Sequence, residues 1–166
     1  MTEVKKATAA PGVFSVMKYA SAVLIIVYVV LLMFQTSVSS RSFDTVASAV
    51  EDSLTASSLK ERDGQRFKRN FGLNSADYEG VLYYSSESGM SAEEVLLIKV
   101  SNTAQVRKVT GAIEERIADR TDAFEEYAPE QAKILADAQL TVRGRFVFYA
   151  ASPDAAQYRA VFDSSL

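Results

Sequence analysis

The feature that most constrains this chain is an uncharged apolar run close to its start. Residues 19–34 read YASAVLIIVYVVLLMF, in which Ser21 is the only clearly polar side chain. As a helix rising about 1.5 Å per residue, this run would reach about 24 Å, slightly less than a hydrocarbon core of about 30 Å. Adding residues 35–38 makes the run long enough to span the hydrocarbon core. The sequence therefore predicts a transmembrane helix over residues 19–38.

The charges beside this run predict its orientation. Lys5, Lys6 and Lys18 precede it, whereas Arg41 is the only basic residue that closely follows it. Because positive charge stays on the cytoplasmic side, we expect a single-pass protein of the cell membrane with a cytoplasmic tail at residues 1–18. The remainder would then be extracytoplasmic. The alternative is a secretory signal peptide, cleaved near Ser37–Ser39, and a secreted product.

The residue types that are missing exclude several kinds of chemistry. The 166 residues include no His and no Cys. This excludes a Ser-His-Asp triad, a thiol nucleophile, a disulfide and a thiolate metal site. A formal net charge of -3 gives no reason to expect a nucleic acid as partner. We expect no cofactor and identify no catalytic or metal-binding residue.

After a polar linker at residues 39–43, residues 44–166 read as one extracytoplasmic domain. Hydrophobic spacing and turn residues predict helices at 44–60 and 60–70, strands at 79–86 and 95–100, a long helix from 102, a helix at 129–138, strands at 139–143 and 145–151, and a last helix from 152. Strand pairs separated by helices favour the α+β class. We expect a small antiparallel or mixed sheet of about four strands packed with helices.

Four segments of the domain together resemble a known family. They read MSAEEVLLIKV (residues 90–100), AIEERI (112–117), FEEYAPEQAKIL (124–135) and GRFVFYAAS (144–152). The pattern is similar to domain of unknown function 4358, a family of small extracytoplasmic proteins of Gram-positive bacteria. Many members are lipoproteins and some are held by a single helix. The family has no established activity, so the resemblance implies a location in the cell envelope rather than a mechanism.

A basic run provides the first candidate site. On a continuous helix, Arg62, Arg66 and Arg69 would share one face and could contact an anionic surface. The alternative is an ordinary solvated face with Phe67 and Phe71 packed beneath it.

Lys99 and Arg116 are candidate ligand contacts. Lys99 interrupts an apolar strand, where it could hold an anionic ligand or extend to the rim of the sheet. Arg116 lies on the long helix within one turn of Glu115 and Asp119, so a surface ion pair is the alternative for it. Adjacent acids such as Glu93 and Glu94 are expected to be solvated charges.

An aromatic cluster on the predicted strands needs a separate interpretation. Its members are Tyr83, Tyr84, Phe146, Phe148 and Tyr149, and we expect them to belong to the core, with alternate members exposed. Any exposed members could line a groove for a sugar or a peptide.

Two functional hypotheses follow from these features. The first is an anchored domain without catalytic activity that binds a protein or a component of the cell envelope. The second is an enzyme or accessory subunit in cell-envelope modification, for example with a membrane O-acyltransferase, because some relatives are encoded near such enzymes. A concave pocket joining Lys99 or Arg116 to an acid and a tyrosine would favour the second hypothesis.

Overall fold

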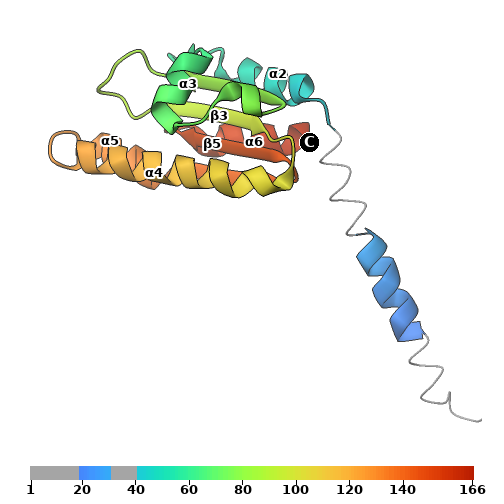
Figure 1. Cartoon of the computed structure of the whole chain (residues 1–166). Coiled ribbons are helices and arrows are strands. Elements are labelled where there is room, and N and C mark those ends of the chain that lie inside the picture. Colours follow the sequence, from blue (N-terminus) through green and yellow to red (C-terminus); the bar gives the residue numbers. More distant parts are fainter. Residues whose placement is uncertain (1–18, 31–40) are drawn as a thin grey trace, which may run out of the picture. The chain divides into compact units, whose positions relative to one another are not determined.

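The computed structural model describes residues 19–30 and 41–166. Residues 41–166 belong to one compact unit, and the helix at residues 19–30 belongs to another (Figure 1).

The predicted transmembrane helix at residues 19–38 is wrong. No helix among residues 19–30 and 41–166 is long and apolar enough to cross a membrane. The described residues 19–30 are helical and uncharged. Residues 31–38 of the prediction, the tail at residues 1–18 and residues 39–40 of the linker lie outside the described residues.

The domain is built on an antiparallel sheet of five strands in the order β1-β2-β3-β5-β4. The strands are β1 (Lys60–Glu61), β2 (Gly80–Ser85), β3 (Glu94–Lys99), β4 (Gln139–Arg143) and β5 (Phe146–Ala151). The central strands β3 and β5 are buried along their whole length. The α+β class is therefore confirmed, with one more strand than the approximate number expected from the sequence.

Helices cover both faces of this sheet. They are α2 (Phe43–Leu54), α3 (Gly64–Phe71), α4 (Val106–Glu125), α5 (Pro129–Ala136) and α6 (Ala155–Ser165). Helices α4 and α5 lie side by side along one face, and α2 and α6 pack on the other (Figure 1).

The alternation of side chains along β3 explains why two separate apolar clusters form. Successive residues of a strand point to opposite faces. Leu96 and Ile98 accordingly join the cluster beneath α3, α4 and α5. Val95 and Leu97 join the cluster beneath α2 and α6. A strand buried on both faces reads as a continuous apolar run, as the sequence predicted here.

The main departure from the predicted elements lies at residues 60–63. Lys60 and Glu61 pair with Ser85 and Tyr84 of β2 instead of continuing a helix. Helix α3 begins only at Gly64, after Asp63 accepts a hydrogen bond from the backbone N–H of Arg66 at 2.8 Å. This side-chain cap starts a new helix at that point.

Two glycines offer a matched test of backbone conformation. Gly72 ends α3 with φ of 66°, where a side chain is strained, whereas Gly111 is an exposed position within α4 with open space around it. We expect Gly72→Ala to lower the free energy of unfolding by about 1 kcal/mol. Gly111→Ala should raise it by up to about 1 kcal/mol. Denaturant unfolding measures both, and shifts of the same sign would contradict this account.

Candidate functional site

The site is centred on Glu94, the first residue of β3. Its side chain shares a face with Leu96, and it is only 1% exposed. Tyr83 of β2 and Tyr149 of β5 both lie opposite Leu96 in the sheet. The two tyrosines therefore stand diagonally beside Glu94 on the same face, within reach of its carboxylate.

Three side chains donate hydrogen bonds to the Glu94 carboxylate. The hydroxyl of Tyr83 donates to Oε2 at 2.9 Å, and that of Tyr149 donates to Oε1 at 3.1 Å. Arg116 reaches the carboxylate from α4, with Nε at 2.8 Å from Oε1 and Nη2 at 2.8 Å from Oε2. This bidentate geometry is the strong form of an arginine–carboxylate pair. Both oxygens are thus fully used as acceptors.

The Arg116 guanidinium is held on its other sides as well. Its Nη1 lies 3.4 Å from the backbone carbonyl oxygen of Asn70, and its Cζ lies 5.0 Å from the centre of the Phe71 ring. Burial alone would lower the pKa of Arg116, but the hydrogen bonds and charge of Glu94 raise it overall. Arg116 therefore stays charged and fixed in position.

The same carboxylate changes the acidity of both tyrosines. Burial, and then the negative charge of Glu94, raises the pKa of Tyr83 to about 12 from an ordinary value of 10.0. Burial followed by Glu94 also raises the pKa of Tyr149. Both hydroxyls therefore remain protonated at neutral pH and act as donors.

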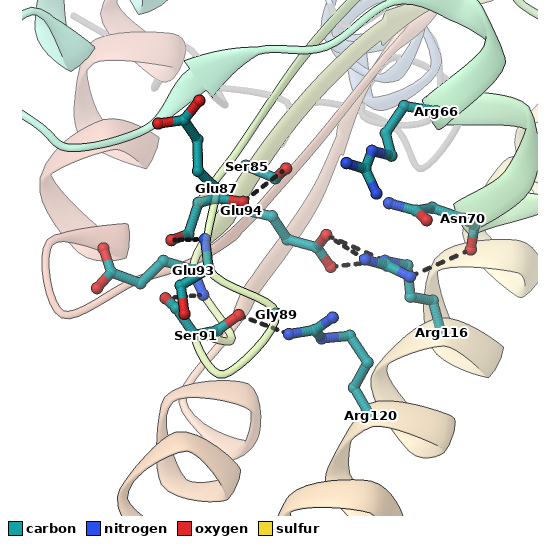
Figure 2. A pocket seen from close by; sticks show the side chains of 12 residues that line it. Arg66, Asn70, Ser85, Glu87, Gly89, Ser91, Glu93, Glu94, Arg116 and Arg120 are labelled. Carbon is teal, nitrogen blue, oxygen red and sulfur yellow. Dashed lines mark hydrogen bonds and ion pairs between the residues drawn. The ribbon is translucent and has the colours of Figure 1, made fainter.

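A cavity of about 120 Å³ opens beside this cluster (Figure 2). The loop between β2 and β3 forms one wall, and α3 and α4 supply arginines to the other. Its lining residues are Arg66, Asn70, Ser85, Ser86, Glu87, Ser88, Gly89, Ser91, Glu93, Glu94, Arg116 and Arg120. We call this cavity the arginine pocket.

Arg120 lies one helical turn after Arg116 on α4. Its Nη2 donates to the backbone carbonyl oxygen of Ser91 at 2.6 Å, and its Cζ lies 5.0 Å from the centre of the Phe124 ring. Its Nε is buried and has no hydrogen-bond partner in the described part of the chain. An unpaired buried donor is costly. The Arg120 guanidinium also forms no ion pair within residues 19–30 and 41–166, although the residue lines the pocket.

Arg66 comes from α3 and reaches toward the same pocket (Figure 2). Its guanidinium makes no hydrogen bond or ion pair with residues 19–30 or 41–166. The Glu87 and Glu93 carboxylates point away from the arginines (Figure 2). Three guanidinium groups therefore face a single carboxylate, that of Glu94, and the interior of the pocket is positive.

The predicted face of Arg62, Arg66 and Arg69 does not exist as one helical surface. Arg62 precedes α3, and its Nε and Nη2 donate to Oγ and O of Ser85 at 2.9 and 3.0 Å. Of the three, only Arg66 lines the arginine pocket, and Arg69 is exposed on α3 outside it. The expected burial of Phe67 and Phe71 beneath α3 is confirmed.

Lys99 and Arg116 lie on opposite faces of the sheet. Lys99 shares the face of Leu97, and its Nζ contacts the Arg41 carbonyl oxygen at 2.8 Å and Glu79 Oε2 at 3.1 Å. The hydrogen bond from Lys99 is the largest cause of a lowered pKa at Glu79. These partners account for Lys99 structurally, and it does not line the arginine pocket.

The sequence interpretation missed the role of Glu94. The expectation that Glu94 is a solvated charge is wrong, and Arg116 pairs with it rather than with Glu115 or Asp119. One signal could have indicated this. Arg116 and Arg120 fill the gap between Ile113 and Phe124 on the buried face of the long helix, where two cations need a buried partner.

A comparison with protein families identifies the domain. A family model named domain of unknown function (DUF4358) matches residues 52–152. The chain belongs to the DUF4358 family. The match includes every residue of the arginine pocket. No curated protein and no solved structure matches the chain significantly.

Breaking the Glu94–Arg116 pair should destabilise this DUF4358 domain strongly. We expect Glu94→Ala and Arg116→Ala each to lower the free energy of unfolding by about 3–5 kcal/mol, because each leaves an uncompensated buried charge. The double variant should cost less than the sum of the two. Denaturant unfolding measures this coupling, with exposed Glu115→Ala as control. Additive losses would contradict the pairing.

The raised pKa of Tyr83 predicts a loss of stability in alkali. A group whose pKa is higher in the folded state stabilises the fold below its unfolded pKa of 10.0, and this contribution is lost as the pH rises through its folded pKa of about 12. Between these two pKa values, each such tyrosine lowers the free energy of unfolding of the wild type by up to about 1.4 kcal/mol per pH unit.

Removing the hydroxyl isolates the contribution of Tyr83. The Tyr83→Phe variant should be less stable at neutral pH but show a shallower decline above pH 10.0. Unfolding experiments across the alkaline range measure the slope, and tyrosinate absorbance reports the ionisation directly. An unchanged slope in the variant is the contrary result.

Proposed function

We propose that this DUF4358 chain is a binding domain without catalytic activity, and that it holds an anionic group of a protein or cell-envelope partner in the arginine pocket. The observation that carries this proposal is that Arg66 and Arg120 line the same cavity while neither guanidinium forms an ion pair with the described residues. Two cations without counter-charges, placed together in a recess, favour an anion as occupant.

The state of the carboxylate supports binding rather than proton transfer. Glu94 accepts hydrogen bonds from Arg116, Tyr83 and Tyr149 on both oxygens, so neither oxygen is free to take a proton from a substrate. The pocket does join Arg116 to an acid, but the two tyrosines reach that acid from the core and do not line the cavity. The extracytoplasmic location implied by the family resemblance stays a prediction.

Site-specific photo-crosslinking of the full chain in its native cells tests the proposal. A photoreactive residue at Glu87, an exposed position on the rim of the pocket, should give one discrete adduct. The same residue at Gln157, exposed on α6, serves as the positional control and should not give that adduct.

A second substitution tests whether the pocket directs the contact. Arg66→Gln should reduce the adduct about tenfold, because a hydrogen-bonded ion contact is lost. Arg69→Gln removes an equal charge from the same helix outside the pocket and should leave the yield unchanged. An adduct indifferent to Arg66, or equal at both labelled positions, would overturn the proposal.

A further inference from the structure

We infer that the group held in the arginine pocket is a phosphate in its dianionic form, as free phosphate or as a terminal monoester. This inference rests on the proposed function and names the chemistry of its ligand. It is carried by the charge of the pocket, the number of its free donors and its size.

The charge of the pocket matches a dianion. Arg66, Arg116 and Arg120 line it, and Glu94 offsets one of these positive charges. Glu87 and Glu93 also line the pocket, but their carboxylates point away from the guanidinium groups (Figure 2). Two positive charges therefore remain for the ligand, and a phosphate monoester carries a charge of about -1.5 to -2 at neutral pH.

The loop opposite the arginines adds further free donors. Its serines already serve as acceptors, since the backbone N–H of Ser88 donates to Ser86 Oγ and that of Met90 donates to Ser88 Oγ. Ser91 Oγ likewise accepts from the backbone N–H of Glu93. The three serine hydroxyl hydrogens have no acceptor within the described residues, so each can donate to a ligand.

The lining residues that carry donors come from three elements. Arg66 belongs to α3, Arg120 belongs to α4, and Ser86, Ser88 and Ser91 belong to the loop between β2 and β3. A tetrahedral oxyanion directs its oxygens in several directions and can accept from all of them. A carboxylate has two oxygens in one plane and would leave some of these donors unpaired.

The size of the pocket limits how the phosphate is carried. A cavity of about 120 Å³ holds one small group, which favours a terminal phosphate. An internal phosphodiester carries a single negative charge and must also accommodate a chain on both sides. We therefore expect the pocket to prefer a monoester to a diester.

Calorimetric titration of the full chain at fixed ionic strength tests the inference with four probes. These are inorganic phosphate, phenyl phosphate, dimethyl phosphate and acetate. The two dianions should bind at least about tenfold more tightly than dimethyl phosphate or acetate, since each lost charged hydrogen bond costs about this factor. The ratio of phenyl phosphate to inorganic phosphate distinguishes an ester from the free ion as the preferred source.

Variants and pH localise the binding. Arg66→Gln should weaken phosphate binding about tenfold, whereas Arg69→Gln should change it by less than about twofold. Arg120→Lys keeps the charge but removes the guanidinium donors, and it should also weaken binding. The chain has no His, so tightening between pH 5 and pH 7 would report formation of the ligand dianion.

The outcomes separate this inference from the proposed function. Equal affinity for acetate and phosphate, or no binding of either, overturns the phosphate assignment. If the Glu87 adduct still depends on Arg66 in that case, the binding function stands with another anion. Phosphate binding unaffected by Arg66→Gln and Arg120→Lys also overturns the inference, because it places the ion elsewhere.

Discussion

The buried contact between Glu94 and Arg116 is the interaction on which this architecture depends. It joins the central strand β3 to α4, and the hydroxyls of Tyr83 and Tyr149 complete it from neighbouring strands. Burying the Glu94 carboxylate to 1% exposure would cost too much free energy without these donors. Arg120, one helical turn after Arg116, has an unpaired Nε and lines the adjoining cavity. The polar core and the binding recess are thus parts of one arrangement.

Much of the domain could be predicted from local patterns. The hairpin of β4 and β5 follows from two strand-like runs around Gly144, whose φ of 57° suits a tight turn. The buried run of β3 and the Pro129 start of α5 were equally readable. The short strand β1 was not, because Lys60 and Glu61 carry no strand signal and pair only because β2 offers an edge. The prediction of a transmembrane helix from the apolar run was wrong, because no helix among residues 19–30 and 41–166 is long and apolar enough to cross a membrane.

The site was only partly accessible to the same reasoning. Arg116 was named as a candidate ligand contact with a surface ion pair as the alternative, and Arg66 was identified within a basic run. Their common pocket depends on the loop between β2 and β3 and on a carboxylate from another element, and no periodicity links those positions. Lys99 drew attention for the same reason as Arg116, yet it lies on the opposite face with Glu79 as partner. Tertiary contacts, not residue type, decided between the two.

The central sheet also keeps the two apolar clusters apart. One contains Phe67, Leu96 and Phe124, and the other contains Val50, Leu97 and Phe162. The two clusters are connected chiefly by strands β3 and β5, which contribute side chains to both clusters. Changes in volume on the α2–α6 side can therefore be accommodated by repacking that layer alone. Substitutions in the α2–α6 layer of this chain are therefore expected to leave the contacts of Glu94 on the opposite face unchanged.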